Sequence, residues 1–407
     1  MRSITLSPVV LALTLTLAGC SSVSMSPERE LAPAGAAPAD PASSPVATRL
    51  PFEPSNAPFA VEVASTADVL VADRCEVDGA QAALCGERGV QHDVITQTDG
   101  SAIGIFRMRS LTVRPNARVI LRGDMPVVLV ASGDVRIDGI VDAAADGDDG
   151  FAGGWSGSRT RTGSMRVDDR GRGPGAGSGP EPASRSGAGG GSFCGLGGGT
   201  GGAIAYGSGA LVPLVGGSSG GGGFSPGGAG GGAVEIVSGR TLTIGAEGIV
   251  HAGGGASMFG GGAGGAGGAI LLEAASVVVR GVVAANGAGG SGNADWGDIL
   301  QRAGQPGLTG AAQARGGVGP NPGGRGSGGA VTDGESGLFE QVIPGSIGPY
   351  AGGGGGGAGR IRIATLSGSA SVTGVVSPSR GTPCTTVGVV KGGDPRAQAG
   401  RDDPSLK

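Results

Sequence analysis

The sequence predicts an all-β fold, a parallel β-solenoid or β-helix-like stack of short coils with glycine-rich loop insertions. Three observations predict it: runs of alternating aliphatic residues, an internal repeat of those runs, and glycine-rich stretches between the copies. Strands favour β-branched residues and point successive side chains to opposite faces, so such alternation indicates strands rather than helices. The chain holds 92 glycines among 407 residues, and they are concentrated outside these runs.

The repeat comprises four stretches, residues 128–143, 232–255, 268–290 and 359–377, and residues 103–123 read as a degenerate earlier copy. Each holds an alternating aliphatic pair, a turn of small residues, a second pair, a glycine and a third aliphatic. In chain order, the aligned positions are Val128, Val130, Val135, Ile137 and Ile140; Val234, Ile236, Leu242, Ile244 and Ile249; Ile270, Leu272, Val277, Val279 and Val282; Ile361, Ile363, Ala370, Val372 and Val375.

One copy of roughly 20–24 residues buries about five aliphatic side chains, too few to offset the entropy lost when its backbone is ordered. Stacked copies solve this problem, because the side chains form apolar columns and the backbones pair about 4.7–4.9 Å apart. The alternative fold is a β-sandwich, in which the same strands would pair antiparallel.

The N-terminus predicts export and a lipid anchor. Arg2 precedes an apolar run over residues 7–17, too short to span a bilayer, and the sequence Leu17-Ala18-Gly19-Cys20 follows. Small residues before a cysteine suit a lipoprotein signal peptidase, after which the cysteine carries the lipid. Residues 1–20 are therefore predicted to be a lipoprotein signal peptide, with Cys20 lipidated; the alternative is an ordinary secretory signal. Ser21, rather than Asp, favours the outer membrane.

Composition divides the rest of the chain. Residues 21–58 are rich in Ala, Pro and Ser and are predicted to be a disordered tether; 59–123 form an N-terminal β region with a two-cysteine loop; 124–390 form the glycine-rich solenoid; 391–407 form a flexible tail. The glycine-rich insertions, 144–231, 253–267 and 287–358, all leave just after the third strand of a copy. They should lie on one face. Because glycine is costly to order, each is either mobile or packed as closely spaced extended strands.

An exported chain favours disulfides. With Cys20 committed to lipid, an even number remains: Cys75, Cys85, Cys194 and Cys384. Proximity favours Cys75–Cys85 and leaves Cys194–Cys384. A zinc site is the alternative, but there is no Cys-x-x-Cys and the two histidines lie far away in the sequence.

No cofactor and no catalytic residue are predicted. The formal charge of −4 argues against nucleic acid as a partner. Asp146, Asp148 and Asp149 are weak calcium candidates, since calcium takes several oxygens from a flexible loop, with a solvated acidic turn as the alternative. Equivalent repeat positions put Asp142, His251, Ala284 and Ser377 in one column. Ser377 would then lie two strands from His251, about 9–10 Å away, too far for a Ser-His-Asp triad.

The pattern Gly-Gly-x-aliphatic-x-aliphatic, followed by a strand, Ala-x-Gly-Gly and a polyglycine run, resembles the uncharacterised glycine-rich surface lipoproteins of gliding soil bacteria. The resemblance extends over about residues 70–390 and includes the two-cysteine loop, the glycines at 352–357 and the segment 360–363. The composition is also similar to PE-PGRS-type repeats, without their N-terminal module. The resemblance implies a surface location and this architecture, and it implies no activity.

These observations lead us to expect a lipid-anchored cell-envelope protein that is structural or adhesive and is not an enzyme. Its partners would be the membrane, through the lipid, and a polysaccharide, a matrix component or a surface protein. The alternative is a polysaccharide-binding or polysaccharide-degrading β-helix protein. A third possibility is that the glycine runs are spacers without a partner.

Overall fold

The computed structural model describes residues 47–158, 170–181, 186–199, 204–293, 302–340 and 351–392. The predicted signal peptide, Cys20, the tether up to residue 46 and the tail from residue 393 lie outside these ranges. The chain divides into two units, 1–44 and 45–407, and the description below concerns the second. In the described residues, no helix is both long and apolar enough to cross a membrane.

The fold is all-β: the described residues form strands and extended segments, with one short 3-10 helix, η1 (Pro58–Val61). The larger sheet follows the order β19-β16-β14-β12-β10-β7-β3, with β5, β6, β9 and β17 beside that path. Its strands are β3 (Asp68–Val71), β5 (Gln91–Thr96), β6 (Ala102–Met108), β7 (Ser110–Val113), β9 (Val127–Ala131), β10 (Val135–Ile137), β12 (Ala233–Ile244), β14 (Ala269–Val279), β16 (Arg360–Thr365), β17 (Ser371–Val372) and β19 (Thr385–Val389).

The second sheet has the order β18-β15-β13-β11-β8-β4. Its strands are β4 (Arg74–Asp78), β8 (Arg118–Arg122), β11 (Ile140–Asp142), β13 (Ile249–His251), β15 (Val282–Ala284) and β18 (Val375–Ser377). Pairing is parallel throughout both sheets except between β5 and β6; the separate pair β1 (Thr48–Arg49) and β2 (Glu62–Val63) is also antiparallel. The antiparallel ladders that a sandwich requires are thus confined to these two pairs among the named strands.

The repeat copies pair with one another strand by strand. Val234 pairs with Ile270, and Ile270 with Ile361, as the alignment predicts. The third positions agree as well, because Ile249 pairs with Val282 and Val282 with Val375. An additional copy that the sequence alignment missed lies at residues 68–78, where β3 pairs with β7 and β4 with β8.

The predicted register of the first copy is wrong by one residue at its first strand. Val234 pairs with Val127, not Val128, and Ile236 pairs with Leu129, not Val130. Because side chains alternate between faces, a one-residue slip exchanges the faces of every residue in the strand. All five residues of β9 are apolar and buried, so alternation alone cannot fix the register there.

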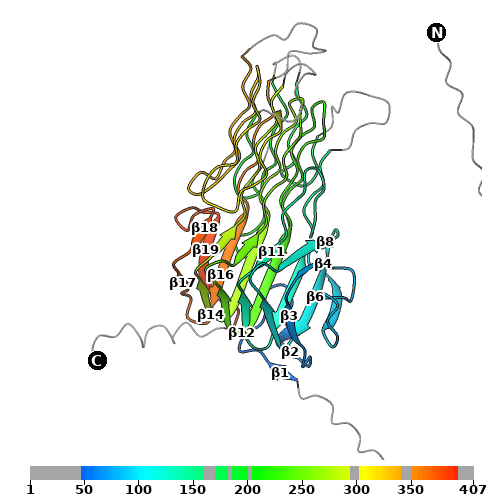
Figure 1. Cartoon of the computed structure of the whole chain (residues 1–407), viewed down its shortest axis with the longest axis vertical. Helices are drawn as coiled ribbons and strands as arrows, with labels where there is room; N and C mark the ends of the chain where they lie inside the picture. The colour runs from blue at the N-terminus through cyan, green and yellow to red at the C-terminus, as the bar shows by residue number, and fades with distance from the viewer. Residues whose placement is uncertain are drawn as a thin grey trace, which may run out of the picture. The chain divides into compact units, whose positions relative to one another are not determined.

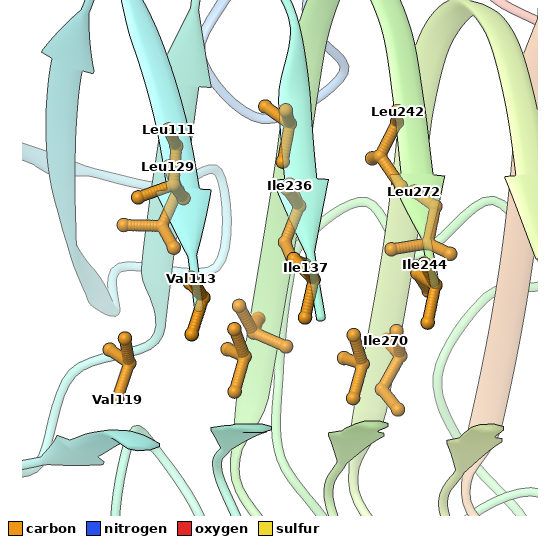
Figure 2. Close-up of a cluster of buried hydrophobic side chains, with 14 of the residues drawn as sticks. Leu111, Val113, Val119, Leu129, Ile137, Ile236, Leu242, Ile244, Ile270 and Leu272 are labelled. Carbon is orange, nitrogen blue, oxygen red and sulfur yellow. The ribbon is translucent and has the colours of Figure 1, made fainter. Parts of the chain in front are cut away.

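The principal core lies between the two sheets, where aliphatic side chains from successive copies form rows (Figure 2). Each such side chain contributes about 1.5–3 kcal/mol on burial. The residues labelled there are Leu111, Val113, Val119, Leu129, Ile137, Ile236, Leu242, Ile244, Ile270 and Leu272, all at most 2% exposed.

A second core covers the opposite face of the larger sheet. It is closed by residues 47–63, here called the N-terminal strap, and by residues of the segment 204–215. Leu50 and Phe52 are 3% exposed and Ala57 is fully buried. The folded part of the chain therefore begins before residue 59, and residues 47–58 are packed on the sheet rather than forming part of a tether.

The glycine-rich insertions extend together from the ends of the strands as a bundle of extended segments (Figure 1). Their common exit follows from the repeat, because each leaves after β11, β13 or β15, three neighbouring parallel strands of the second sheet. We call the described residues of 143–199, 216–232, 252–268 and 285–359 the glycine bundle.

Candidate functional site

The glycine bundle is held by backbone hydrogen bonds with a period of three residues. In its central segment, residues 262–268, three successive N–H groups donate to three different neighbours: Ala263 to Gly221, Gly264 to Gly354 and Gly265 to Gly255, at 2.9–3.0 Å. The carbonyls of the same three residues accept from Gly228, Gly191 and Ala288, at 2.8–3.0 Å. The central segment is thus hydrogen-bonded to six neighbouring stretches of backbone. Three residues per turn is the periodicity of the polyproline II helix, which forms no hydrogen bonds within itself.

Glycine is required here because neighbouring backbones approach too closely for a side chain. A Cβ atom at Gly264 would overlap the carbonyl oxygen of Ala288, and one at Gly265 would overlap that of Ala229. Alanine occurs only at every third position of this segment, at Ala263 and Ala266, and both are fully buried. The three-residue period is therefore visible in the sequence.

The bundle continues the hydrogen bonding of the sheets. At the start of β14, Ala269 N donates to Gly232 O at 2.9 Å, and one residue earlier Gly268 N donates to Ala252 O at 2.7 Å. The same strands that build the stacked copies therefore lead directly into the bundle without an intervening flexible linker.

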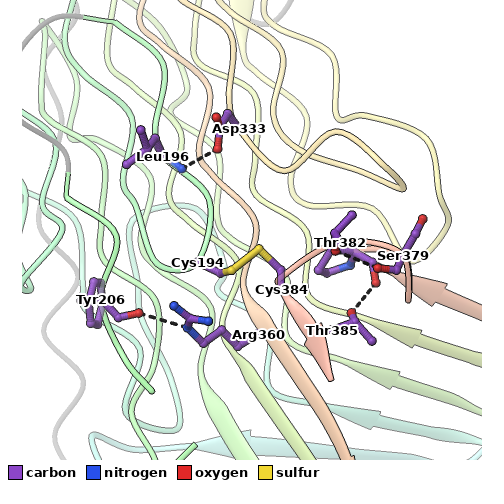
Figure 3. Close-up of a disulfide and its surroundings, with 10 residues drawn as sticks. Cys194, Leu196, Tyr206, Asp333, Arg360, Ser379, Thr382, Cys384 and Thr385 are labelled. Atoms are coloured by element: carbon purple, nitrogen blue, oxygen red, sulfur yellow. Dashed lines mark hydrogen bonds between the residues drawn. A yellow bond between two sulfur atoms is a disulfide. The ribbon is translucent and has the colours of Figure 1, made fainter. Parts of the chain in front are cut away.

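The two disulfides are Cys75–Cys85, which sequence proximity favours, and Cys194–Cys384, the pair that remains. Cys75–Cys85 joins β4 to the loop that follows it, and Cys194–Cys384 joins a bundle segment to the residue before β19 with a Cα–Cα distance of 5.6 Å (Figure 3). Two further bonds surround the second bridge: Leu196 N donates to Asp333 Oδ1 at 2.8 Å, and Arg360 Nε donates to Tyr206 O at 3.1 Å.

A cleft of about 340 Å³ lies where the second sheet meets the bundle. Asp142 and His251, two members of the predicted column, pair with each other and line the cleft. Ala284 and Ser377 continue the column but are not among the residues that line the cleft. His251 Nδ1 lies 3.5 Å from Asp142 Oδ1, and its Nε2 lies 3.0 Å from the carbonyl of Gly307 in the bundle. Burial raises the pKa of Asp142, but hydrogen bonds from His251 and Arg118 outweigh this effect and lower the pKa to about 2.

The three arginines that line this cleft are all paired with carboxylates. Arg118 binds Asp142, while Arg74 and Arg122 lie 3.2 and 3.5 Å from Glu76. The Arg122 guanidinium also lies 3.9 Å from the ring centre of Phe151, in the first insertion. This network joins the sheet to the bundle, and it leaves little charge for a ligand.

Ser377 does not complete a triad with Asp142 and His251. Its hydroxyl donates to Asn286 Oδ1 at 2.7 Å and accepts from Gly329 N at 2.8 Å, both in the bundle. The register places it two strands from His251, as the sequence predicts. Ser377 therefore fastens the bundle to β18.

The three calcium candidates form an exposed turn. Asp146 and Asp149 exchange two backbone hydrogen bonds of 3.0 Å, and their side chains, like that of Asp148, face solvent. Within the described ranges, no group of three or more His, Cys, Asp or Glu residues is arranged to hold a metal ion.

A buried carboxyl pair was missed by the sequence analysis. Glu235 of β12 and Glu273 of β14 are 0 and 1% exposed, under the N-terminal strap. Asn56 Nδ2 donates to Glu235 Oε2 at 2.9 Å, and Ser55 Oγ donates to Glu273 Oε1 at 2.6 Å. Burial and the neighbouring Glu273 raise the pKa of Glu235. The sequence feature that could have indicated this pair is a single acidic residue within each of two apolar runs, AVEIV and ILLEA.

Comparisons of the chain with protein-family models, with curated proteins and with solved structures find no match.

Proposed function

We propose that this chain is a lipid-anchored extracytoplasmic protein of the outer membrane with a structural or adhesive role, in which a parallel β-solenoid carries the glycine bundle. The solenoid is supported by the parallel ladders that join each repeat copy to the next. The anchor is supported by the sequence around Cys20.

One observation carries the functional proposal: the six-neighbour hydrogen bonding of the central segment. Ordering glycine loses more backbone entropy than ordering any other residue, so a flexible spacer gains nothing from such packing. A rigid bundle is useful when a binding surface must be held away from the point at which the protein is anchored. The bundle is therefore the part that meets the surroundings, and the solenoid is its base.

Limited proteolysis of the lipidated full-length protein tests the rigid bundle against the spacer. We expect the described residues of 195–358 to resist a broad-specificity protease, although they include arginines and exposed apolar residues. Cleavage throughout this stretch at the rate of an unfolded peptide would contradict the proposal.

Surface display and adhesion are tested separately on whole cells. We expect antibody to reach the protein on intact cells, Cys20→Ser to abolish lipid labelling and membrane retention, and the displayed protein to bind extracellular matrix material saturably. Absence of the protein from the envelope fraction would refute this location.

A further inference from the structure

Three segments form the outer surface of one side of the glycine bundle: residues 311–318, 321–327 and 332–338, here called the outer layer. Gly323 N and Gly326 N donate to the carbonyls of Gly317 and Ala314, both at 2.9 Å. On the other side, Glu335 N donates to Arg325 O at 2.8 Å and Leu338 N to Pro322 O at 2.9 Å. The middle segment thus runs antiparallel to both neighbours.

This register creates two rows of side chains across the outer layer. Residue 325 lies opposite 315 and 335, so that the first row is Arg315, Arg325 and Glu335. Residue 322 lies opposite 318 and 338, so that the second row is Val318, Pro322 and Leu338. The rows are three residues apart, about 9 Å at 3.1 Å per residue.

The two rows line a groove of about 390 Å³, with Gly316, Gly317 and Gly323 between them. Val318 is 57% and Leu338 53% exposed, and the three charged residues of the first row are exposed as well. The groove is therefore open to solvent, with one charged and one apolar side and a floor of bare backbone.

The two arginines of this groove are exposed and differ from the seven arginines that ion pairs hold on or beside the sheets. Ion pairs with carboxylates engage Arg49, Arg74, Arg107, Arg109, Arg118, Arg122 and Arg136. Arg315 and Arg325 have no ion pair within the part of the chain that the structure describes, although Glu335 lies in their row. Two guanidinium groups against one carboxylate leave the row with a surplus positive charge.

We propose that the outer layer binds a linear polysaccharide that carries carboxylate or sulfate groups. The guanidinium groups of Arg315 and Arg325 match the paired oxygens of such anions, and the apolar row offers contact to the C–H face of a sugar ring. The groove is too open to enclose a small molecule, and it lacks the aromatic anchors typical of protein interfaces. This inference rests on the proposed adhesive function and names its site and ligand class.

The test compares the full-length protein and three double variants on immobilised polygalacturonate and dextran sulfate, with uncharged dextran as the neutral probe. We expect wild type to bind one or both anionic polymers and not dextran, with binding weakened by added salt. Arg315→Ala with Arg325→Ala should weaken that binding about ten- to a hundredfold. Arg240→Ala with Arg280→Ala is the matched control, because it removes the same charge from an exposed position of β12 and from the exposed residue that follows β14, and this variant should bind as wild type.

Val318→Ser with Leu338→Ser should also weaken binding, with an unchanged salt dependence. These are surface substitutions, and an unchanged thermal unfolding midpoint establishes that every variant is folded. Equal binding by wild type and the Arg315/Arg325 variant would overturn this site while leaving the adhesive function in place. If wild type binds dextran as well as the anionic polymers, or binds none of the three, the proposed ligand class is wrong. The rigidity of the glycine bundle is tested separately, by the proteolysis experiment.

Discussion

At the scale of single residues, the glycines of the bundle act through the side chain that they lack. Gly264 is surrounded by backbone on all sides, and a Cβ atom there would overlap the Ala288 carbonyl. By contrast, nothing lies within 4 Å of a Cβ atom at Gly310. Glycine is therefore required only at particular positions of the bundle, and composition alone does not reveal which positions these are.

We predict that Gly264→Ala destabilises the protein by about 3 kcal/mol, at the upper end of the usual cost of overpacking, because the neighbouring backbone has no room to move. Gly310→Ala should change stability by less than about 0.5 kcal/mol. Chemical denaturation of the two variants checks both values. Equal stability of the two variants would show that the central segment is not closely packed.

The buried Glu235, which lies beside Glu273, gives stability an unusual dependence on pH. A carboxyl whose pKa is raised in the folded state binds its proton more tightly there, so its contribution is complete below its unfolded pKa and declines as pH rises through the folded pKa. Asp142 behaves oppositely, since its lowered pKa removes stability only as pH falls from about 4 towards about 2. Above pH 5, Glu235 is therefore the carboxyl group whose raised pKa makes stability fall as pH rises.

We predict that Glu235→Gln removes this decline. In wild type the free energy of unfolding should fall above pH 5 by up to about 1.4 kcal/mol per pH unit, the slope for one proton, until Glu235 has titrated. The glutamine variant should show a flatter profile, because its amide carries no charge at any pH. Denaturation between pH 5 and pH 9 checks this, and parallel profiles for the two proteins would contradict it.

At the scale of elements, the strands of the repeat were predictable, while the bundle was not. The aliphatic pairs of β12, β14 and β16 align in the sequence as they pair in the structure, because one face of each packs in the principal core. In β9 the sequence Val-Val-Leu-Val-Ala fits either register, because both faces are buried, one of them under the N-terminal strap. Nothing local to β9 indicates the strap.

The bundle could not be predicted in detail because its bonds join segments distant in sequence. Ala263 and Ala266 show the three-residue period, but the partners Gly221, Gly354 and Gly255 are unremarkable members of long glycine runs. The column of Asp142, His251 and Ser377 was predicted because it depends only on repeat register. The hydrogen bonds that Ser377 makes to the bundle were not.

The two disulfides stabilise elements of different span, and we predict that their removal differs accordingly. Loop-closure entropy gives up to about 5 kcal/mol for the separation of 190 residues between Cys194 and Cys384, and about 3 kcal/mol for the separation of 10 between Cys75 and Cys85. Serine replacement of both cysteines of each bridge, followed by denaturation, measures the difference. A greater loss at Cys75–Cys85 would mean that the bundle is ordered without its covalent connection to the chain before β19.

At the scale of the whole molecule, sheets and bundle share their chain at every repeat. Segments of the bundle begin after β11, β13 and β15 and end at β12, β14 and β16, and the hydrogen bonds run without interruption from Gly268 into β14. The cleft network, through His251 and Gly307, ties the two parts again from the side. Neither part can open without exposing the backbone groups of the other.

We therefore predict one cooperative unfolding transition for the described residues of 47–392. We expect the buried backbone N–H groups to exchange with solvent through this same transition. The N–H groups of Ala263, Gly264 and Gly265 should exchange only by global unfolding, as slowly as those of β12 and β14, although this segment contains no regular strand. The outer layer, which carries exposed residues in all three of its segments, should exchange faster. Rapid exchange in the central segment, with β12 and β14 still protected, would show that the bundle opens independently of the sheets. A bundle that opens in this way could not be a rigid support for the groove of Arg315 and Arg325.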